Sequence, residues 1–215
     1  MITRRGSILV LMATIPALTL RWAFPPAAAT DHPAAGKVSR IKGTANFDRD
    51  GATAPLADGT AIMVGDAIVT GADSRLELTL LDETKVTLGA NAKLVVDKYL
   101  YDPGKGQGAT LLDIAKGAFR FTTGKMASLK DRNMQVRTEF ASLSVRGTDF
   151  WGGPIDNSNG VLAIKGKVEV KTEKGTVVLE GGKQGSMVAG IDEEPGPIKV
   201  WAQAKIDRAI ATIAF

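Results

Sequence analysis

Apolar and polar residues alternate with a period of two over most of the chain after its first thirty-five residues. The clearest case is residues 75–80, where Leu76, Leu78 and Leu80 are separated by polar or charged residues. Such alternation is typical of a strand with one buried and one solvated face. Roughly ten to twelve such strands, separated by glycine-bearing turns, have the spacing of a β-sandwich or barrel. The sequence therefore predicts one all-β domain over residues 36–190.

The phase of this alternation changes twice between residues 134 and 151. Val136 and Phe140 share one phase, and Leu143 has the opposite one. Since a slip of one residue turns every later side chain to the other face, the chain must bulge or bend near residues 140–141 and again near 146–147. Bends of this kind are typical of strands that pass from one sheet to another.

Residues 111–114 and 118–121 flank a turn at Lys116 and Gly117. Two apolar runs separated by a short glycine-bearing turn are typical of a β-hairpin. The sequence therefore predicts that these two segments pair with each other.

The C-terminal residues 195–215 change character. Ile206, Ala209, Ile210 and Ile213 recur at helical spacing. This pattern predicts an amphipathic helix, and Trp201 extends its apolar stripe. We expect the helix to pack on the edge of the sandwich; a partner-binding role is the alternative.

The first 29 residues have the three parts of a secretory signal. Arg4 and Arg5 precede the apolar run 6–20, and Ala27–Ala29 resembles a cleavage site. The run is shorter than the roughly 20 residues of a membrane-spanning helix. We expect a cleaved signal peptide at 1–29, a linker at 30–35, and a periplasmic mature protein that does not span the membrane. An uncleaved anchor is the alternative.

Charge and cysteine content restrict the kinds of partner that the protein can have and the interactions that stabilise it. Loss of Arg4, Arg5 and Arg21 with the leader would lower the formal net charge from +4 to +1. Because nucleic-acid binding needs clustered positive charge, we expect no nucleic-acid partner. The chain has no cysteine, so the mature protein depends on core burial without disulfides.

The sequence offers little catalytic chemistry. The one histidine, His32, lies in the predicted linker, which argues against Ser-His-Asp and Cys-His catalysis and removes the commonest zinc ligands. We therefore expect neither an enzyme nor a cofactor or metal. The oxygen-rich segments 48–51 and 156–160 could hold calcium, but their compositions are also those of ordinary turns.

Three motifs in one order carry a family resemblance: GDAIVT at 65–70, a turn and strand at 81–89 that begins with Leu81-Asp82, and VRGTDF at 145–150. Together they resemble the FecR domain over about residues 36–188. The resemblance implies a jelly-roll-like β-sandwich outside the cytoplasmic membrane that acts through protein or other ligand contacts. Glu83 departs from the family, which usually has glycine there. Because few residues precede the apolar run, we also expect no cytoplasmic arm and no direct anti-sigma role.

Three residues are candidates for ligand binding. Tyr99 and Tyr101 share one side of a strand beside a glycine-rich loop and could form an aromatic platform, although packing at the sheet edge is the alternative. Arg146 could bind a ligand, or its five donors could bond carbonyls at the corner formed with Gly147. Thr148 could bond backbone groups left open at the same corner, as could the aspartate that follows it.

These observations favour a non-catalytic periplasmic module for protein interaction or envelope signalling, with an envelope protein as its partner. The alternative is a carbohydrate- or cell-wall-binding module, whose partner would be a cell-wall glycan. Such a module would need exposed aromatic side chains, and the domain has few aromatic residues.

Overall fold

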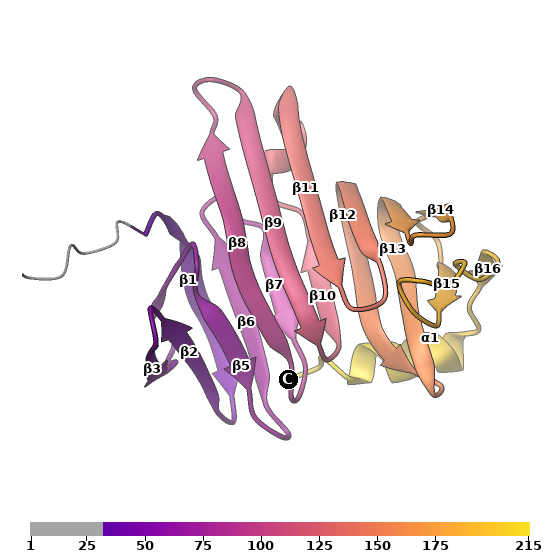
Figure 1. Ribbon diagram of the computed structural model, residues 1–215, viewed down its shortest axis with the longest axis horizontal. Coiled ribbons are helices and arrows are strands. Elements are labelled where there is room, and N and C mark those ends of the chain that lie inside the picture. The colour runs from indigo at the N-terminus through magenta and orange to yellow at the C-terminus, as the bar shows by residue number, and fades with distance from the viewer. Residues whose placement is uncertain (1–31) are drawn as a thin grey trace, which may run out of the picture. The chain divides into compact units, whose positions relative to one another are not determined.

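A computed structural model describes residues 32–215 (Figure 1). The predicted signal peptide at 1–29 and the first residues of the predicted linker lie outside the described residues. This part of the chain consists mostly of strands and ends in a short α-helix, so the predicted all-β class is confirmed. The first strand begins at Ala34, within the predicted linker, and Ala35 is already fully buried.

Sixteen strands, one 3₁₀ helix and one α-helix follow one another in the described residues. They are β1 (Ala34–Lys42), β2 (Ala45–Arg49), β3 (Ala52–Pro55), β4 (Ala61–Met63), β5 (Ala67–Thr70), β6 (Arg75–Leu80), β7 (Lys85–Leu88), β8 (Lys93–Asp102), β9 (Gln107–Lys116), β10 (Phe119–Thr122), η1 (Lys125–Ser128), β11 (Asp131–Thr138), β12 (Ser142–Ile155), β13 (Ser158–Lys171), β14 (Thr176–Glu180), β15 (Gln184–Val188), β16 (Lys199–Val200) and α1 (Gln203–Ala211). The described residues form more strands than the ten to twelve that the sequence predicts, partly because β2, β3 and β16 lack a clear alternation of apolar residues.

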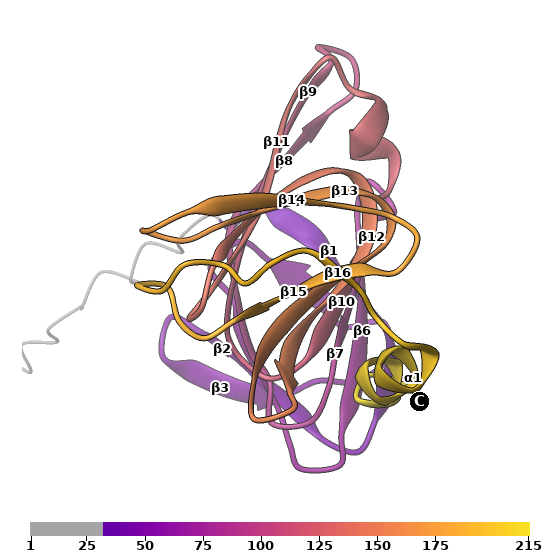
Figure 2. The ribbon, with the colours of Figure 1, turned by 90° about the vertical axis from the view of Figure 1, so that its right-hand side faces the viewer.

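All these strands belong to one hydrogen-bonded sheet that curls over on itself. Its main path runs β3-β2-β5-β8-β9-β11-β12-β10-β7-β6-β1-β4, and β13 to β16 continue from β12. The first part of β12 pairs with β11 and its later part pairs with β10. The strands β8, β9 and β11 therefore lie over β6, β7 and β10, as the two layers of a sandwich (Figures 1 and 2).

The passage of β12 and β13 between the two layers confirms the predicted bend near residues 146–147. The register of this pair shifts between Arg146 and Asp149. Gly147 has a φ of +64° and Gly166, on β13, has a φ of +77°. A Cβ at Gly166 would collide with the carbonyl oxygen of Gly147. The corner therefore requires glycine at residue 166 for two reasons: its positive φ and the lack of room for a side chain.

The predicted change of direction near residues 140–141 is a bend, but the expectation that it carries the strand from one sheet to another is wrong. β11 ends at Thr138 and β12 begins at Ser142, and the two strands pair antiparallel. The hydroxyl of Thr138 accepts the N–H of Ala141 at 2.9 Å and closes the turn between them. The change of phase in the sequence marks a hairpin turn between two strands.

The predicted hairpin of residues 111–121 is also wrong. β9 pairs antiparallel with β8 and parallel with β11, whereas β10 pairs with β7 and β12. The chain crosses from one layer to the other at Gly117, whose φ is +89°. A glycine-bearing turn between two apolar runs is compatible with both connections, because it does not specify which neighbour each strand takes.

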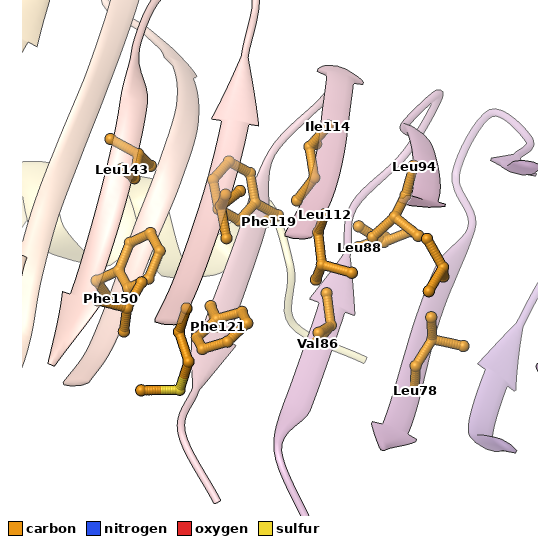
Figure 3. Close-up of a cluster of buried hydrophobic side chains, with 14 of the residues drawn as sticks. Leu78, Val86, Leu88, Leu94, Leu112, Ile114, Phe119, Phe121, Leu143 and Phe150 are labelled. Atoms are coloured by element: carbon orange, nitrogen blue, oxygen red, sulfur yellow. The ribbon is translucent and has the colours of Figure 1, made fainter. Parts of the chain in front are cut away.

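The core between the layers is formed by the buried faces of the alternating strands (Figure 3). Leu76, Leu78 and Leu80 are all buried, as their alternation predicts. The ring of Phe150 on β12 contacts Phe119 edge-on at 5.8 Å between centroids. Each fully buried side chain of this size contributes about 1.5–3 kcal/mol of transfer free energy. The core therefore includes residues of both layers, among them Leu78, Val86, Leu88, Leu94, Leu112, Ile114, Phe119, Phe121, Leu143 and Phe150.

The predicted C-terminal helix is confirmed, but only over α1, because β16 occupies part of the predicted range 195–215. The helix packs on the outer face of β12 and β13, whereas packing on the edge of the sandwich was expected. Trp151 follows Phe150 in the strand and points to the opposite face, where it contacts Trp201 at 6.2 Å between ring centroids. Asp156 holds the helix from the β12–β13 turn through Lys205 at 3.0 Å and Arg208 at 2.8 Å. Within residues 32–215 no helix has the length and hydrophobicity to cross a membrane.

Candidate functional site

The corner of β12 is stabilised by Thr148 and Asp149. Thr148 donates its hydroxyl to the carbonyl of Lys167 and its N–H to the hydroxyl of Thr123. It therefore bonds open backbone groups as expected. Asp149 instead accepts two hydrogen bonds from the guanidinium of Arg120, at 2.8 and 2.6 Å. This carboxylate raises the pKa of Arg120 and fixes the corner against β10.

Arg146 takes no part in this network. Its side chain is exposed on β12, and no hydrogen bond from its guanidinium is found among the described residues. It lies where β11 and β12 separate, because the bend at Gly147 turns β12 toward β10. The pairing of β11 with β12 ends at Gln135 and Ser144, although β11 continues beside β9 as far as Asp131.

The separation of the two strands leaves a solvent-open groove of about 330 Å³, which we call the seam groove. Seven residues line it: Lys130, Arg132, Asn133, Met134, Ser144, Val145 and Arg146. Met134 and Val145 are buried at its floor, while the three cationic side chains are exposed at its rim. The lining contains no histidine and no carboxylate.

The cations of the seam groove form no ion pairs with the described residues. Lys130, Arg132 and Arg146 form no ion pair within residues 32–215, and the one hydrogen bond from the Arg132 side chain goes to the carbonyl of Leu129. By contrast Arg137, further along β11, contacts both Asp97 and Asp113. Cations that form no ion pair beside a polar groove attract anionic groups. The arrangement is suited to binding an anionic ligand.

The two tyrosines do not form an exposed platform. Tyr99 is 8 % exposed, and its hydroxyl donates to the carboxylate of Asp82 at 3.0 Å and accepts the N–H of the same residue at 2.9 Å. Burial and the Asp82 charge raise the pKa of Tyr99. Tyr101 is half-buried and packs against the same core. Tyr99 therefore has a structural role in the core.

Sequence reasoning missed Asp82 as the centre of a buried polar network. Its carboxylate is fully buried. Besides the hydrogen bond from the Tyr99 hydroxyl, it accepts one from the hydroxyl of Thr84 at 2.6 Å and one from the N–H of Met126 at 3.1 Å. Through the bond to Met126 it fixes η1 to the turn between β6 and β7. Glu83, which follows it, has a φ of +67°, so it adopts the left-handed conformation that favours glycine.

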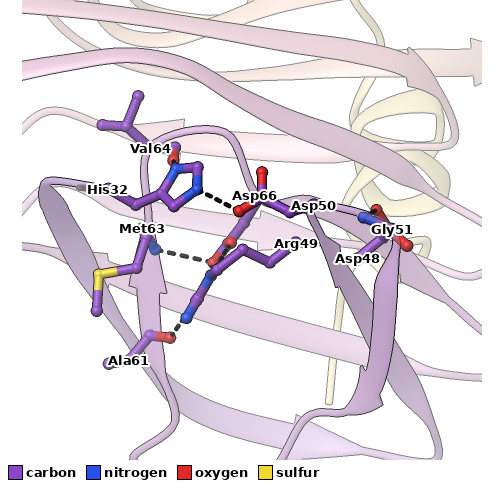
Figure 4. A network of polar contacts seen from close by, with 9 residues as sticks. All are labelled: His32, Asp48, Arg49, Asp50, Gly51, Ala61, Met63, Val64 and Asp66. Carbon is purple, nitrogen blue, oxygen red and sulfur yellow. Dashed lines mark hydrogen bonds and ion pairs between the residues drawn. The ribbon is translucent and has the colours of Figure 1, made fainter. Parts of the chain in front are cut away.

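The acidic turn 48–51 belongs to a structural network that includes the histidine (Figure 4). The buried carboxylate of Asp66 accepts two hydrogen bonds from Arg49, at 2.6 and 2.7 Å. His32 contacts the carboxylate of Asp50 at 2.7 Å and the carbonyl of Val64 at 3.0 Å. Asp50 raises the pKa of His32. His32 is therefore attached to the domain.

The second acidic turn, 156–160, carries the carboxylate that holds α1 through Lys205 and Arg208. Over residues 32–215, no group of three or more histidine, cysteine or acidic side chains could hold a metal ion. The acidic turns therefore have structural contacts, and the seam groove is the candidate functional site.

Comparison with known proteins agrees with this fold. Two crystal structures of a protein from Parabacteroides distasonis, described as "a putative anti-sigma factor", are similar at TM-scores of 0.53 and 0.52 with 20 % identity. Each similarity covers 66 % of this chain and 62 % of that one, so the chain matches less than two thirds of the length of its structural neighbour. No curated protein matches the chain.

The family described as FecR protein, a family of signalling-related regulatory domains, matches residues 66–178, which include β12 with its corner and most of both layers. The chain belongs to the FecR family.

Proposed function

We propose that this chain is an exported, non-catalytic module that takes part in envelope signalling by binding a partner protein in the periplasm. The observation that carries this proposal is the seam groove. Its rim presents three cations that form no ion pair within residues 32–215, and its lining lacks the histidine or carboxylate that general acid–base catalysis near neutral pH usually employs. Membership of a regulatory family supports a binding role in signalling.

Export is the part of the proposal that rests on the sequence of residues 1–29. The apolar run and the alanines that follow it support cleavage near Ala29. N-terminal sequencing of the protein recovered from envelope fractions tests this directly. A new N-terminus close to Thr30 supports export with cleavage, and an intact Met1 in the inner membrane would contradict it.

A glycan-binding function is the weaker candidate. Stacking on sugars needs an exposed ring face, and Tyr99 is buried in the core with its hydroxyl bonded to Asp82. The seam groove also has no aromatic residue in its lining. Both observations favour a protein partner over a neutral glycan.

The proposal is tested by capture from the native envelope. The full chain, carrying an affinity tag, is cross-linked in cells and purified beside Arg146→Glu and Lys37→Glu variants. Lys37 is an exposed cation on β1, without an ion pair among the described residues, and provides a control of equal charge change. We expect one defined envelope protein to be captured by the wild type and the control. Retention on purified cell wall with no protein partner would contradict the proposal.

Removal of residues 195–215 is unsuitable as a control in this experiment. Trp201, Ala209 and Ile213 are buried with Trp151 in a small hydrophobic cluster between α1 and the outer face of β12 and β13. Their loss would expose that cluster and weaken the fold, so a change in partner capture would not report on binding alone.

A further inference from the structure

We propose that the seam groove binds an acidic, extended peptide segment of the protein partner, which adds as a strand along the free edge of β11. This inference rests on the proposed function and specifies the chemistry of its partner. Three features of the groove carry it: the backbone of β11, the charge of the rim, and the apolar floor.

The backbone of β11 offers a short open edge. Asp131 donates its N–H to Gly106, on the β9 side, at 3.0 Å, and Thr138 donates to Ala141, on the β12 side, at 2.9 Å. Because backbone groups alternate in direction along a strand, those of Arg132 point away from β9 and toward the groove. The ladder with β12 ends at Gln135, so no described strand pairs with Arg132 on that side. An open edge of this kind is a template for another strand.

The charge of the rim selects the sequence of the added strand. Lys130, Arg132 and Arg146 surround the open edge without acidic partners among residues 32–215. The neighbouring Lys167 is different, because it forms an ion pair with Glu180. Complementary charge favours acidic side chains in the ligand and raises the rate of encounter.

The floor of the groove explains why a peptide fits better than an acidic glycan. Met134 and Val145 are apolar and buried at 3 % and 4 % exposure. An extended peptide places alternate side chains on opposite faces, so aliphatic residues could meet this floor while acidic residues meet the rim. A polyanionic glycan would meet the cations but would leave the β11 backbone edge without hydrogen-bond partners.

The first experiment measures binding of the purified full chain to a fluorescent peptide of alternating glutamate and valine, by anisotropy. A lysine–valine peptide, inorganic phosphate and polygalacturonate serve as competing probes. We expect only the acidic peptide to bind, with an affinity that falls as salt is raised. Arg146→Glu should weaken binding about tenfold or more, and Lys37→Glu should leave it unchanged. Stronger binding of polygalacturonate would overturn the inference in favour of a glycan.

The second experiment tests strand addition with the protein unaltered. Two versions of the acidic peptide carry N-methyl groups, one on every glutamate nitrogen and the other on every valine nitrogen. Since only one set of N–H groups can face β11, we expect one version to lose binding and the other to keep it. Equal affinities would show that charge alone holds the peptide, which would overturn strand addition.

Failure of this inference is distinguishable from failure of the proposed function. If the envelope protein is captured by the wild type and equally by Arg146→Glu, while the acidic peptide does not bind, the interaction function stands and the groove is not its site. If no envelope protein is captured, the proposed function itself fails.

Discussion

The indole N–H of Trp151 donates a 3.0 Å hydrogen bond to the hydroxyl of Thr212, although the two residues are 61 positions apart. Thr212 in turn donates to the carbonyl of Ala209, at the end of α1. This relationship connects the last turn of the helix with the outer face of β12. The C-terminal segment is thus part of the folded domain, even though the FecR family match ends at residue 178.

Thr212→Val should destabilise the protein while preserving the shape of the side chain. The substitution leaves the buried indole N–H of Trp151 without its acceptor, so the free energy of unfolding should fall by about 1–3 kcal/mol. Urea denaturation measures the change. Gln203→Ala, at the exposed start of the same helix, is the control and should cost only about 0.2–0.5 kcal/mol. Equal stability of Thr212→Val and wild type would show that the contact is not formed.

The Arg120–Asp149 pair should couple β10 to the β12 corner. Asp149 is 16 % exposed and Arg120 35 % exposed, so solvent screens the pair in part. We expect Asp149→Ala to lower the free energy of unfolding by about 1–2 kcal/mol, the range for a hydrogen bond to a charged group reduced by screening. A double-mutant cycle with Arg120→Ala should show coupling between the two sites. Strict additivity of the two substitutions would contradict a bidentate pair.

Substitutions at two residues with positive φ should have opposite effects on stability, because one residue has room for a side chain and the other does not. Glu83 adopts a positive φ on an exposed turn, so Glu83→Gly should leave the free energy of unfolding unchanged or raise it by about 1 kcal/mol. Its exposed contact with Lys125 contributes little. Gly166→Ala should instead be strongly destabilising, because the added Cβ collides with Gly147. Thermal unfolding compares the two, and a tolerated alanine at residue 166 would contradict the described corner.

The alternation of apolar residues was enough to predict the fold class and several strands. Leu76, Leu78 and Leu80 are buried as their period of two requires, because each side chain of a strand takes its face from the local backbone alone. Strand partners could not be predicted in the same way. Gly117 ends an apolar run whether the chain turns back on itself or crosses to the other layer.

The candidate site was only partly predictable for the same reason. Arg146 was identified from its motif, but Lys130 and Arg132 join it only through the hairpin that Thr138 closes. The sequence around Tyr99 is compatible with an exposed platform and with packing at the sheet edge, because the burial of Tyr99 depends on Asp82 from a separate turn. Contacts between segments far apart in sequence leave no local pattern.

His32 should make the stability of the domain depend on pH. Its contact with Asp50 raises the pKa of the imidazole above its ordinary value of 6.5, so the folded protein binds this proton more tightly than the unfolded chain. The contact therefore contributes stability below about pH 6.5, and this contribution is lost as the pH rises through the raised pKa. His32→Ala should lower the unfolding midpoint more at about pH 5.5 than at about pH 8.5.

The control for this pH dependence is Asp50→Asn, which keeps the size of the side chain and removes its charge. It should reduce the difference between the effects of His32→Ala at the two pH values. An effect of His32→Ala that is equal at both values would show that the imidazole does not gain a proton through Asp50.

Amide hydrogen exchange of the full chain, with and without the envelope protein that it captures, tests the interaction account most directly. We predict that binding increases protection at Lys130–Met134 and Ser144–Arg146, which line the seam groove, and leaves β1 unchanged. Protection confined to the exposed segment around Ile198 and Val200, with the seam groove unaffected, would contradict it.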